Sequence, residues 1–175
     1  MKTILKITFV IFCLLVFCRC TPRVYTVTGW EIGTIVNPQF AEKVMVIEDY
    51  EFETYVKSWL GYSSLLENRK IVGDASDCLV SELRGVLTEY AVIKKAETDN
   101  VNPNAEIVKI KPLNVSFKEN FLQTGFIASI KVEIQSKGKT ETVSAKGDGK
   151  SFKESLTNAC ENIAEKIRKL ITEQK

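Results

Sequence analysis

The run Phe126-Ile-Ala-Ser-Ile-Lys-Val-Glu-Ile-Gln135 decides the fold, because apolar and polar residues alternate along most of it. Successive side chains of a β-strand point to opposite faces, so alternation of period two is typical of a strand with one face in the core and one in water. The pattern predicts such a strand here. Its core face holds Phe126, Ala128, Ile130, Val132 and Ile134, and its wet face holds Ser129, Lys131, Glu133 and Gln135.

One further strand is predicted on each side of this one. Ser136-Lys-Gly138 is turn-like, residues 139–146 return with Val143 and Ala145 inward, and Gly147-Asp-Gly149 closes the strand. Upstream, residues 105–117 alternate but are interrupted by Pro112. Proline cannot donate to a sheet, so this strand is expected to lie at an edge or to be bulged there. Three successive strands with short connections predict an antiparallel meander.

Two amphipathic helices are predicted to cover the sheet. From Phe152 to Ile171 apolar residues recur at helical spacing, with lysines and glutamates opposite, and this helix is expected to lie across the meander. A second helix is predicted from Ser76 to Glu89, with Asp74 and Asp77 as N-cap candidates. Capping is favoured over catalysis for these two carboxylates.

Two short strands complete the predicted sheet. Lys43–Ile47 is a compact apolar run bounded by charges, typical of a central strand buried on both faces, and Tyr90–Ile93 is a second short strand. The fold class predicted is α+β, with a mostly antiparallel sheet of about five strands covered by two main helices and preceded by an N-terminal signal segment.

A third helical stripe is predicted after the first of these strands. Phe52, Tyr55, Trp59 and Leu60 recur at helical spacing before Gly61. Exposed aromatic patches mark contact sites, so these four residues form a candidate partner-contact patch; the alternative is that they pack on the sheet. A hairpin through residues 59–72 is a further alternative.

The first residues predict export. Lys2 and Lys6 precede the apolar run Ile7–Phe17, which suits a signal peptide and is shorter than the roughly 20 residues of a membrane-spanning helix. Residues 1–17 are therefore interpreted as a lipoprotein-type signal peptide, 18–40 as a tether with a first extended segment, and 41–175 as one globular domain.

Lipidation is predicted at the end of this signal. Leu15-Val-Phe-Cys18 resembles a bacterial lipobox, so Cys18 is the expected lipid anchor, with Cys20 as the alternative. Phe17 departs from that motif, which favours a small residue before the cysteine. Plain secretion, with Cys18 and Cys20 as a small-residue cleavage site, is the competing interpretation.

Charge and composition argue against several classes of function. Without Lys2 and Lys6, the 24 basic residues fall to 22 and equal the 22 acidic ones, so nothing favours nucleic-acid binding. The chain has no histidine, the commonest general base and metal ligand. We therefore expect no catalytic residues, no metal site, no cofactor and no enzymatic activity.

The body of the chain holds two cysteines, Cys78 and Cys160. Disulfides persist outside the cytoplasm, so these two are a candidate disulfide between the two predicted helices. Cys160 lies on the inward stripe of its helix, whereas Cys78 is expected toward the flank of the other.

The order of these elements resembles that of small bacterial envelope lipoproteins, namely the YajG-like and transport-auxiliary lipoproteins with a TolB N-terminal-type α/β domain. The resemblance covers residues 40–172 and includes the entry Asn104-Ala-Glu-Ile-Val108 into the meander. It implies an outer-membrane lipoprotein facing the periplasm, held by its N-terminal lipid and assisting envelope assembly or transport through an envelope protein partner. The alternative function is a soluble secreted domain that binds a small ligand between helix and sheet.

Overall fold

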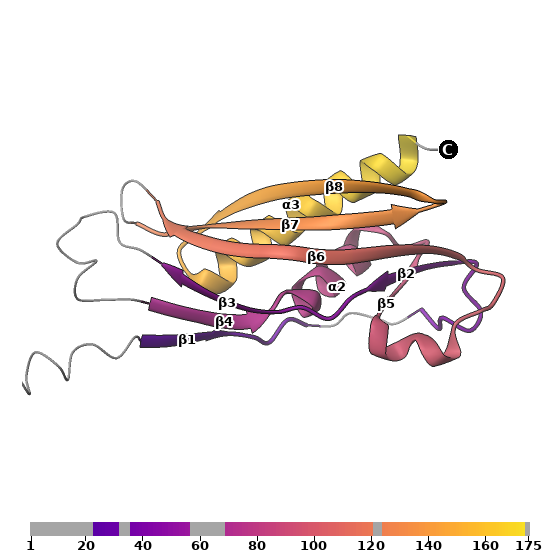
Figure 1. The fold of residues 1–175 in the computed structure, drawn as a ribbon, viewed down its shortest axis with the longest axis horizontal. Coiled ribbons are helices and arrows are strands. Elements are labelled where there is room, and N and C mark those ends of the chain that lie inside the picture. The colour runs from indigo at the N-terminus through magenta and orange to yellow at the C-terminus, as the bar shows by residue number, and fades with distance from the viewer. Residues whose placement is uncertain (1–22, 32–35, 57–68, 121–123, 174–175) are drawn as a thin grey trace, which may run out of the picture.

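A computed structural model describes residues 23–31, 36–56, 69–120 and 124–173 of the 175-residue chain. The described residues form eight strands, two α-helices and one 3₁₀-helix (Figure 1). In chain order they are β1 Arg23–Val27, β2 Lys43–Ile47, β3 Glu51–Val56, β4 Arg69–Asp74, α2 Ala75–Val86, β5 Ala91–Lys94, η1 Lys95–Asn100, β6 Glu106–Glu119, β7 Phe126–Ser136, β8 Lys139–Gly149 and α3 Phe152–Glu173.

The strands form two sheets. In the five-stranded sheet, ordered β5-β2-β6-β7-β8, the last three strands pair antiparallel, which confirms the predicted meander. Strand β2 is parallel to both neighbours, so its predicted central position is confirmed in a mixed sheet. A second sheet, ordered β1-β4-β3, was not predicted. The α+β class is confirmed.

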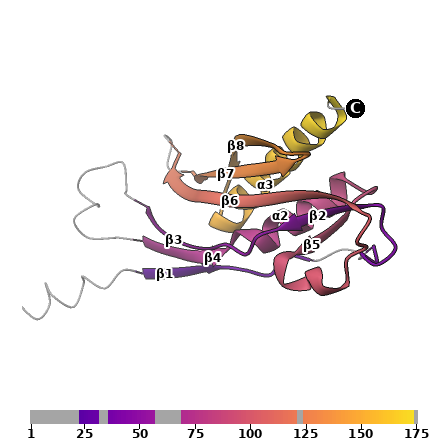
Figure 2. The ribbon, with the colours of Figure 1, turned by 45° about the vertical axis from the view of Figure 1, so that its right-hand side comes forward.

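Both α-helices lie on the same side of the strands (Figure 2). The apolar stripe predicted for α3 is buried, with Leu156, Ile163 and Ile167 fully covered between α3, β7 and β8. Helix α2 packs beside α3. Glycines in β8 let α3 approach closely, because a methyl group at Gly147 would lie 2.6 Å from the Ser155 carbonyl oxygen.

Helix side chains reach the carbonyl groups at both edges of the five-stranded sheet. At the β8 edge, α3 donates three hydrogen bonds to alternate carbonyl oxygens, and at the β5 edge Arg84 of α2 donates two to Val92 O, through Nε at 3.0 Å and Nη2 at 2.8 Å. The α3 bonds are Asn158 Nδ2 to Asp148 O at 2.6 Å, Asn162 Nδ2 to Lys146 O at 2.8 Å and Lys166 Nζ to Ser144 O at 2.6 Å.

The predicted helix carrying the partner-contact patch is wrong over its described residues. Residues 51–56 form strand β3, which pairs antiparallel with β4. Period-two geometry places Phe52 in the core, 5% exposed, and Tyr55 on the opposite face, 48% exposed. These two residues therefore share no surface. Of the alternative hairpin through residues 59–72, only 69–72 are described, and they belong to β4, which pairs with β3. Trp59 and Leu60 lie outside the described residues.

The first extended segment predicted within residues 18–40 is strand β1 in the structure. Strand β1 is parallel to β4, and Tyr25 packs edge-on against Phe152 with ring centroids 5.3 Å apart. Trp30 Nε1 donates to Thr157 Oγ1 at 3.1 Å, which fastens the following segment to α3. Strand β1 is therefore part of the folded body, held by aromatic packing against α3.

Pro112 lies at a bulge, which is one of the two positions predicted for it. Strand β6 is not at an edge, since β2 pairs with its first half and β7 with its second. The register shifts between Pro112 and Asn114, which leaves Leu113 outside the ladder and partly exposed. Pro112, which has no amide hydrogen to donate, lies beyond the end of β2.

Candidate binding surface

The titratable residues that the structure describes are arranged for stability. Among them, no group of three or more cysteine, aspartate or glutamate side chains is placed to hold a metal ion. No described helix is both long and apolar enough to cross a membrane. An ion cluster and a pair of buried thiols instead lie at the contacts that α2 makes with its neighbours.

Asp74, Asp77 and Lys94 form the ion cluster at the start of α2. Lys94 Nζ lies 3.0 Å from Asp74 Oδ2 and 2.6 Å from Asp77 Oδ1, which ties the end of β5 to the helix. Asp74 Oδ1 also accepts a hydrogen bond from the Ser76 amide at 2.8 Å and another from the Ser76 hydroxyl. Asp74 is thus the N-cap, as predicted, and the cluster is structural.

This environment shifts two pKa values in opposite directions. Burial raises the pKa of Asp74, but the hydrogen bonds from Ser76 and Lys94 outweigh burial and lower it. Burial lowers the pKa of Lys94, but hydrogen bonds to Asp77 and Asp74 outweigh burial and raise it. Both shifts favour the charged pair in the folded protein.

We expect Asp74→Asn to lower the free energy of unfolding by about 1 kcal/mol at neutral pH, because asparagine keeps the cap but loses the charge. A lowered folded-state pKa stabilises the protein above the unfolded pKa of aspartate, and this stabilisation is lost as pH falls through the folded pKa. The difference between wild type and variant, measured by urea unfolding, should therefore shrink below about pH 4. A difference that stays constant down to about pH 2 would exclude the charge as its source.

The two body cysteines meet between α2 and α3. Both are free thiols and fully buried, and Cys78 lies on the side of α2 that faces α3. Cys78 Sγ lies 3.7 Å from Leu156 O, one helical turn before Cys160. Burial, reinforced by the neighbouring Cys160 thiol, raises the pKa of Cys78. The predicted disulfide stays a prediction, with its two members adjacent in the core.

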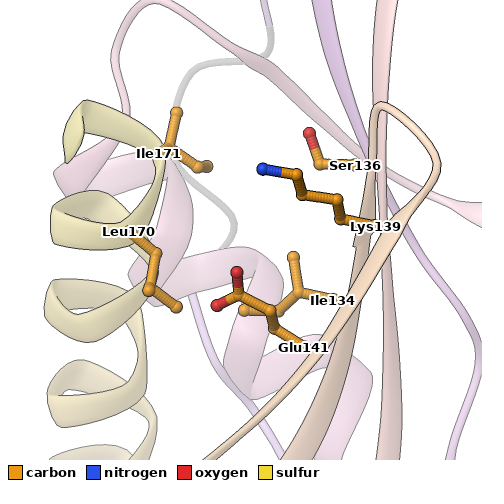
Figure 3. A pocket seen from close by; sticks show the side chains of 6 residues that line it. All are labelled: Ile134, Ser136, Lys139, Glu141, Leu170 and Ile171. Carbon is orange, nitrogen blue, oxygen red and sulfur yellow. The ribbon is translucent and has the colours of Figure 1, made fainter. Parts of the chain in front are cut away.

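One cleft lies between α3 and the β7–β8 hairpin (Figure 3). Leu170 and Ile171 of α3 face Ile134, Lys139 and Glu141 across it. Its volume of about 10 Å³ is room for roughly one water molecule. This cleft between helix and sheet is too small for the ligand that the secreted-domain alternative requires.

A larger groove lies beside α2 and β5. Its volume is about 490 Å³, and Arg84, Tyr90 and Val36 are among the residues that line it. Arg84 Nη1 is buried without a partner among the described residues, and burial lowers the pKa of Arg84. Since Nε and Nη2 both bind Val92 O, most of this guanidinium serves the sheet edge.

The outer face of the meander is a polar surface. Alternation in β6, β7 and β8 turns core residues toward the helices and leaves the other face exposed. We call its five lysines the lysine face: Lys109, Lys111, Lys118, Lys131 and Lys146, all exposed.

Cross-strand register brings these lysines onto one surface. Lys111 is opposite Glu133, and Lys131, two residues before Glu133 on β7, is opposite Asn114. Lys146 is opposite Ser129. The described residues place no carboxylate within ion-pair distance of any of these five ammonium groups; Glu133 instead accepts a hydrogen bond from Gln135 Nε2 at 2.9 Å. The surface therefore presents a net positive charge.

The sequence-predicted site residues do not contribute to this face. Phe52 is in the core, Tyr55 donates to Glu53 Oε1 at 2.9 Å on the other sheet, and Cys18 and Cys20 lie outside the described residues. The lysine face was missed because alternation identified wet positions one strand at a time. Only the register between strands gathers lysines that are 37 residues apart in sequence, from Lys109 to Lys146.

Neither a protein-family model nor a curated protein matches the chain. A solved structure described as "Crystal structure of uncharacterized protein" is similar, with 10% sequence identity, 89% of this chain and 99% of that chain covered, and a TM-score of 0.43. That protein is itself uncharacterised, so the similarity assigns no activity to this chain. The resemblance to envelope lipoproteins stays a prediction.

Proposed function

We propose that the protein is a non-enzymatic lipoprotein of the bacterial cell envelope, anchored by an acylated Cys18 or, as the alternative, Cys20. It acts as an accessory component in envelope assembly or transport and binds an envelope partner. The resemblance to outer-membrane lipoproteins supports a position on the outer membrane, facing the periplasm. No cofactor and no nucleic acid are involved.

The short separation in sequence between Cys18 and the first described strand is the observation that carries this proposal. Cys18 precedes Arg23 by five residues, which span at most about 17 Å when extended. Two or more acyl chains on one cysteine give stable anchoring, because each buried methylene contributes about 0.8 kcal/mol. A lipid at Cys18 would therefore hold the domain close against the bilayer and keep its surfaces available to envelope components.

Labelling with radioactive palmitate in a lipoprotein-processing bacterium tests the anchor. We expect the full chain to incorporate label, Cys18→Ala to lose it, and Cys13→Ala, a matched change inside the apolar run, to keep it. Label lost only in Cys20→Ala would support the anchor at the alternative cysteine. No incorporation into the full chain would overturn the proposal.

The groove beside α2 favours the alternative function, a secreted domain for a small ligand. Its volume of about 490 Å³ falls within the range of ligand sites, and Arg84 supplies a cation beside the apolar Val36 and Val92. A secreted domain would carry no palmitate and would be recovered without detergent, so the same labelling experiment separates the two functions.

A further inference from the structure

The lysine face carries more positive charge than the rest of the balanced chain would suggest. Five lysines share the outer face of the meander with two acids, Glu133 and Asp148, whereas basic and acidic residues are equal after the presequence. An excess of lysines on one surface attracts anions through long-range electrostatics. The surface therefore suits an anionic partner.

The chemistry of this face argues against a protein as that partner. Stable protein interfaces have an apolar or aromatic centre with few charged residues. The exposed or half-buried apolar residues of this part of the sheet, Ile107, Leu113 and Ile127, are separated along β6 and β7. A face of lysine, serine, threonine and asparagine instead suits a broad anionic surface that needs no pocket.

The orientation of the strands fits a planar partner. Figure 1 looks down the shortest axis of the molecule, and β6, β7 and β8 run along the longest axis, with the helices behind them. The lysine face is therefore a broad side of the molecule and can meet a plane along its length. Lys109 and Lys111, two residues apart on β6, are separated by about 7 Å along the strand.

We propose that the lysine face lies against an anionic phospholipid bilayer through contacts between lysine ammonium groups and lipid phosphates. The inference deepens the proposed function, on which it rests for the tether that brings the face to the membrane. A tether raises the local concentration of the face at the bilayer, so weak individual contacts suffice.

Vesicle co-sedimentation tests this directly. The full chain carrying Cys18→Ser and Cys20→Ser has no lipid and is mixed with vesicles of phosphatidylglycerol and phosphatidylcholine in equal parts, or of phosphatidylcholine alone. Lys109→Gln, Lys111→Gln and Lys131→Gln together are expected to lower the partition coefficient on the anionic vesicles about 100-fold. The presequence is identical in all variants, so its contribution cancels when the variants are compared on the same vesicles.

A matched triple variant removes the same charge elsewhere. Lys139, Lys150 and Lys169 are exposed and lie outside the lysine face, so their change to glutamine is expected to alter partitioning less than about 5-fold. Equal binding of the two triple variants to anionic vesicles would overturn the inference. Loss of binding to soluble polyphosphate with no loss on vesicles would also overturn it, in favour of a soluble polyanion.

The outcome is separate from that of the palmitate experiment. Because both candidate anchor cysteines are serine in every vesicle sample, vesicle binding does not depend on acylation. If no palmitate is incorporated but vesicle binding depends on these lysines, the lipid anchor is excluded and the contact between the lysine face and the bilayer is retained. If palmitate is incorporated but vesicle binding does not depend on these lysines, the lipid anchor is retained and the contact between the lysine face and the bilayer is excluded.

Discussion

Gly147→Ala is expected to lower the free energy of unfolding by about 3 kcal/mol, because it forces a methyl group against the backbone of a packed helix. The added methyl group would lie 2.5 Å from the Asn158 carbonyl carbon and 2.6 Å from the Ser155 carbonyl oxygen. Both atoms belong to the α3 backbone, which cannot move aside without lifting the helix from β8. Chemical denaturation followed by circular dichroism measures the loss.

Gly85→Ala is the matched control for this substitution. Gly85 lies within α2, and a methyl group there meets nothing within 4 Å. Alanine is a better helix former than glycine, so this variant is expected to gain about 0.5 to 1 kcal/mol. If Gly147→Ala unfolds at the same denaturant concentration as wild type, the close approach of α3 to β8 is contradicted.

Refolding with oxidised glutathione is expected to join Cys78 to Cys160 and to stabilise the protein by about 2 to 4 kcal/mol. The bridge would close a loop of about 80 residues and so restrict the unfolded chain. The two thiols supply two electrons and two protons, and one oxidised glutathione becomes two reduced ones. Burial raises the pKa of Cys78 and hides both thiols, so the reaction belongs to folding rather than to the native state.

The experiment uses a chain in which Cys13, Cys18 and Cys20 are serine, so that only the body cysteines react. Unfolding in urea, with and without a reductant, should show the gain and its loss on reduction. The same chain with Cys160→Ser should show neither. Two free thiols titrated in urea after oxidative refolding would contradict the pairing.

The meander and α3 were predictable because each is a long, regular pattern whose meaning is local. Ala128, Ile130 and Val132 alternate strictly and are buried as predicted, and the stripe of α3 faces them. The N-cap of α2 was predictable for the same reason, since Asp74 needs only its own helix. These features depend on neighbours within a few residues.

The second sheet was not predictable because its signals are short and depend on tertiary contacts. The spacing of Phe52, Tyr55 and Val56 fits a helical turn as well as a strand, and pairing with β4 decides between them. Strand β1 is held by Tyr25 against Phe152, a contact across 127 residues. Patterns of five or six residues cannot reveal partners at such distances.

The lysine face also combines a local pattern that the sequence reveals with a pairing between strands that it does not. The sequence identified Lys131 as a wet position, but the cluster exists only once β6, β7 and β8 are paired in register. The cysteine pair was predicted from cellular context alone, and the structure adds that Cys78 and Cys160 are adjacent and buried.

The hydrogen bonds that α3 side chains donate to β8 also limit which proteins can pair with this sheet. Exposed strand edges invite another strand to pair, which is a route both to partner binding and to fibrils. At β8, three carbonyl groups already accept from Asn158, Asn162 and Lys166, so an incoming strand would have to displace all three. The edge of the five-stranded sheet at β8 is therefore protected, and pairing of many copies into longer sheets is blocked at this edge even at high protein concentration.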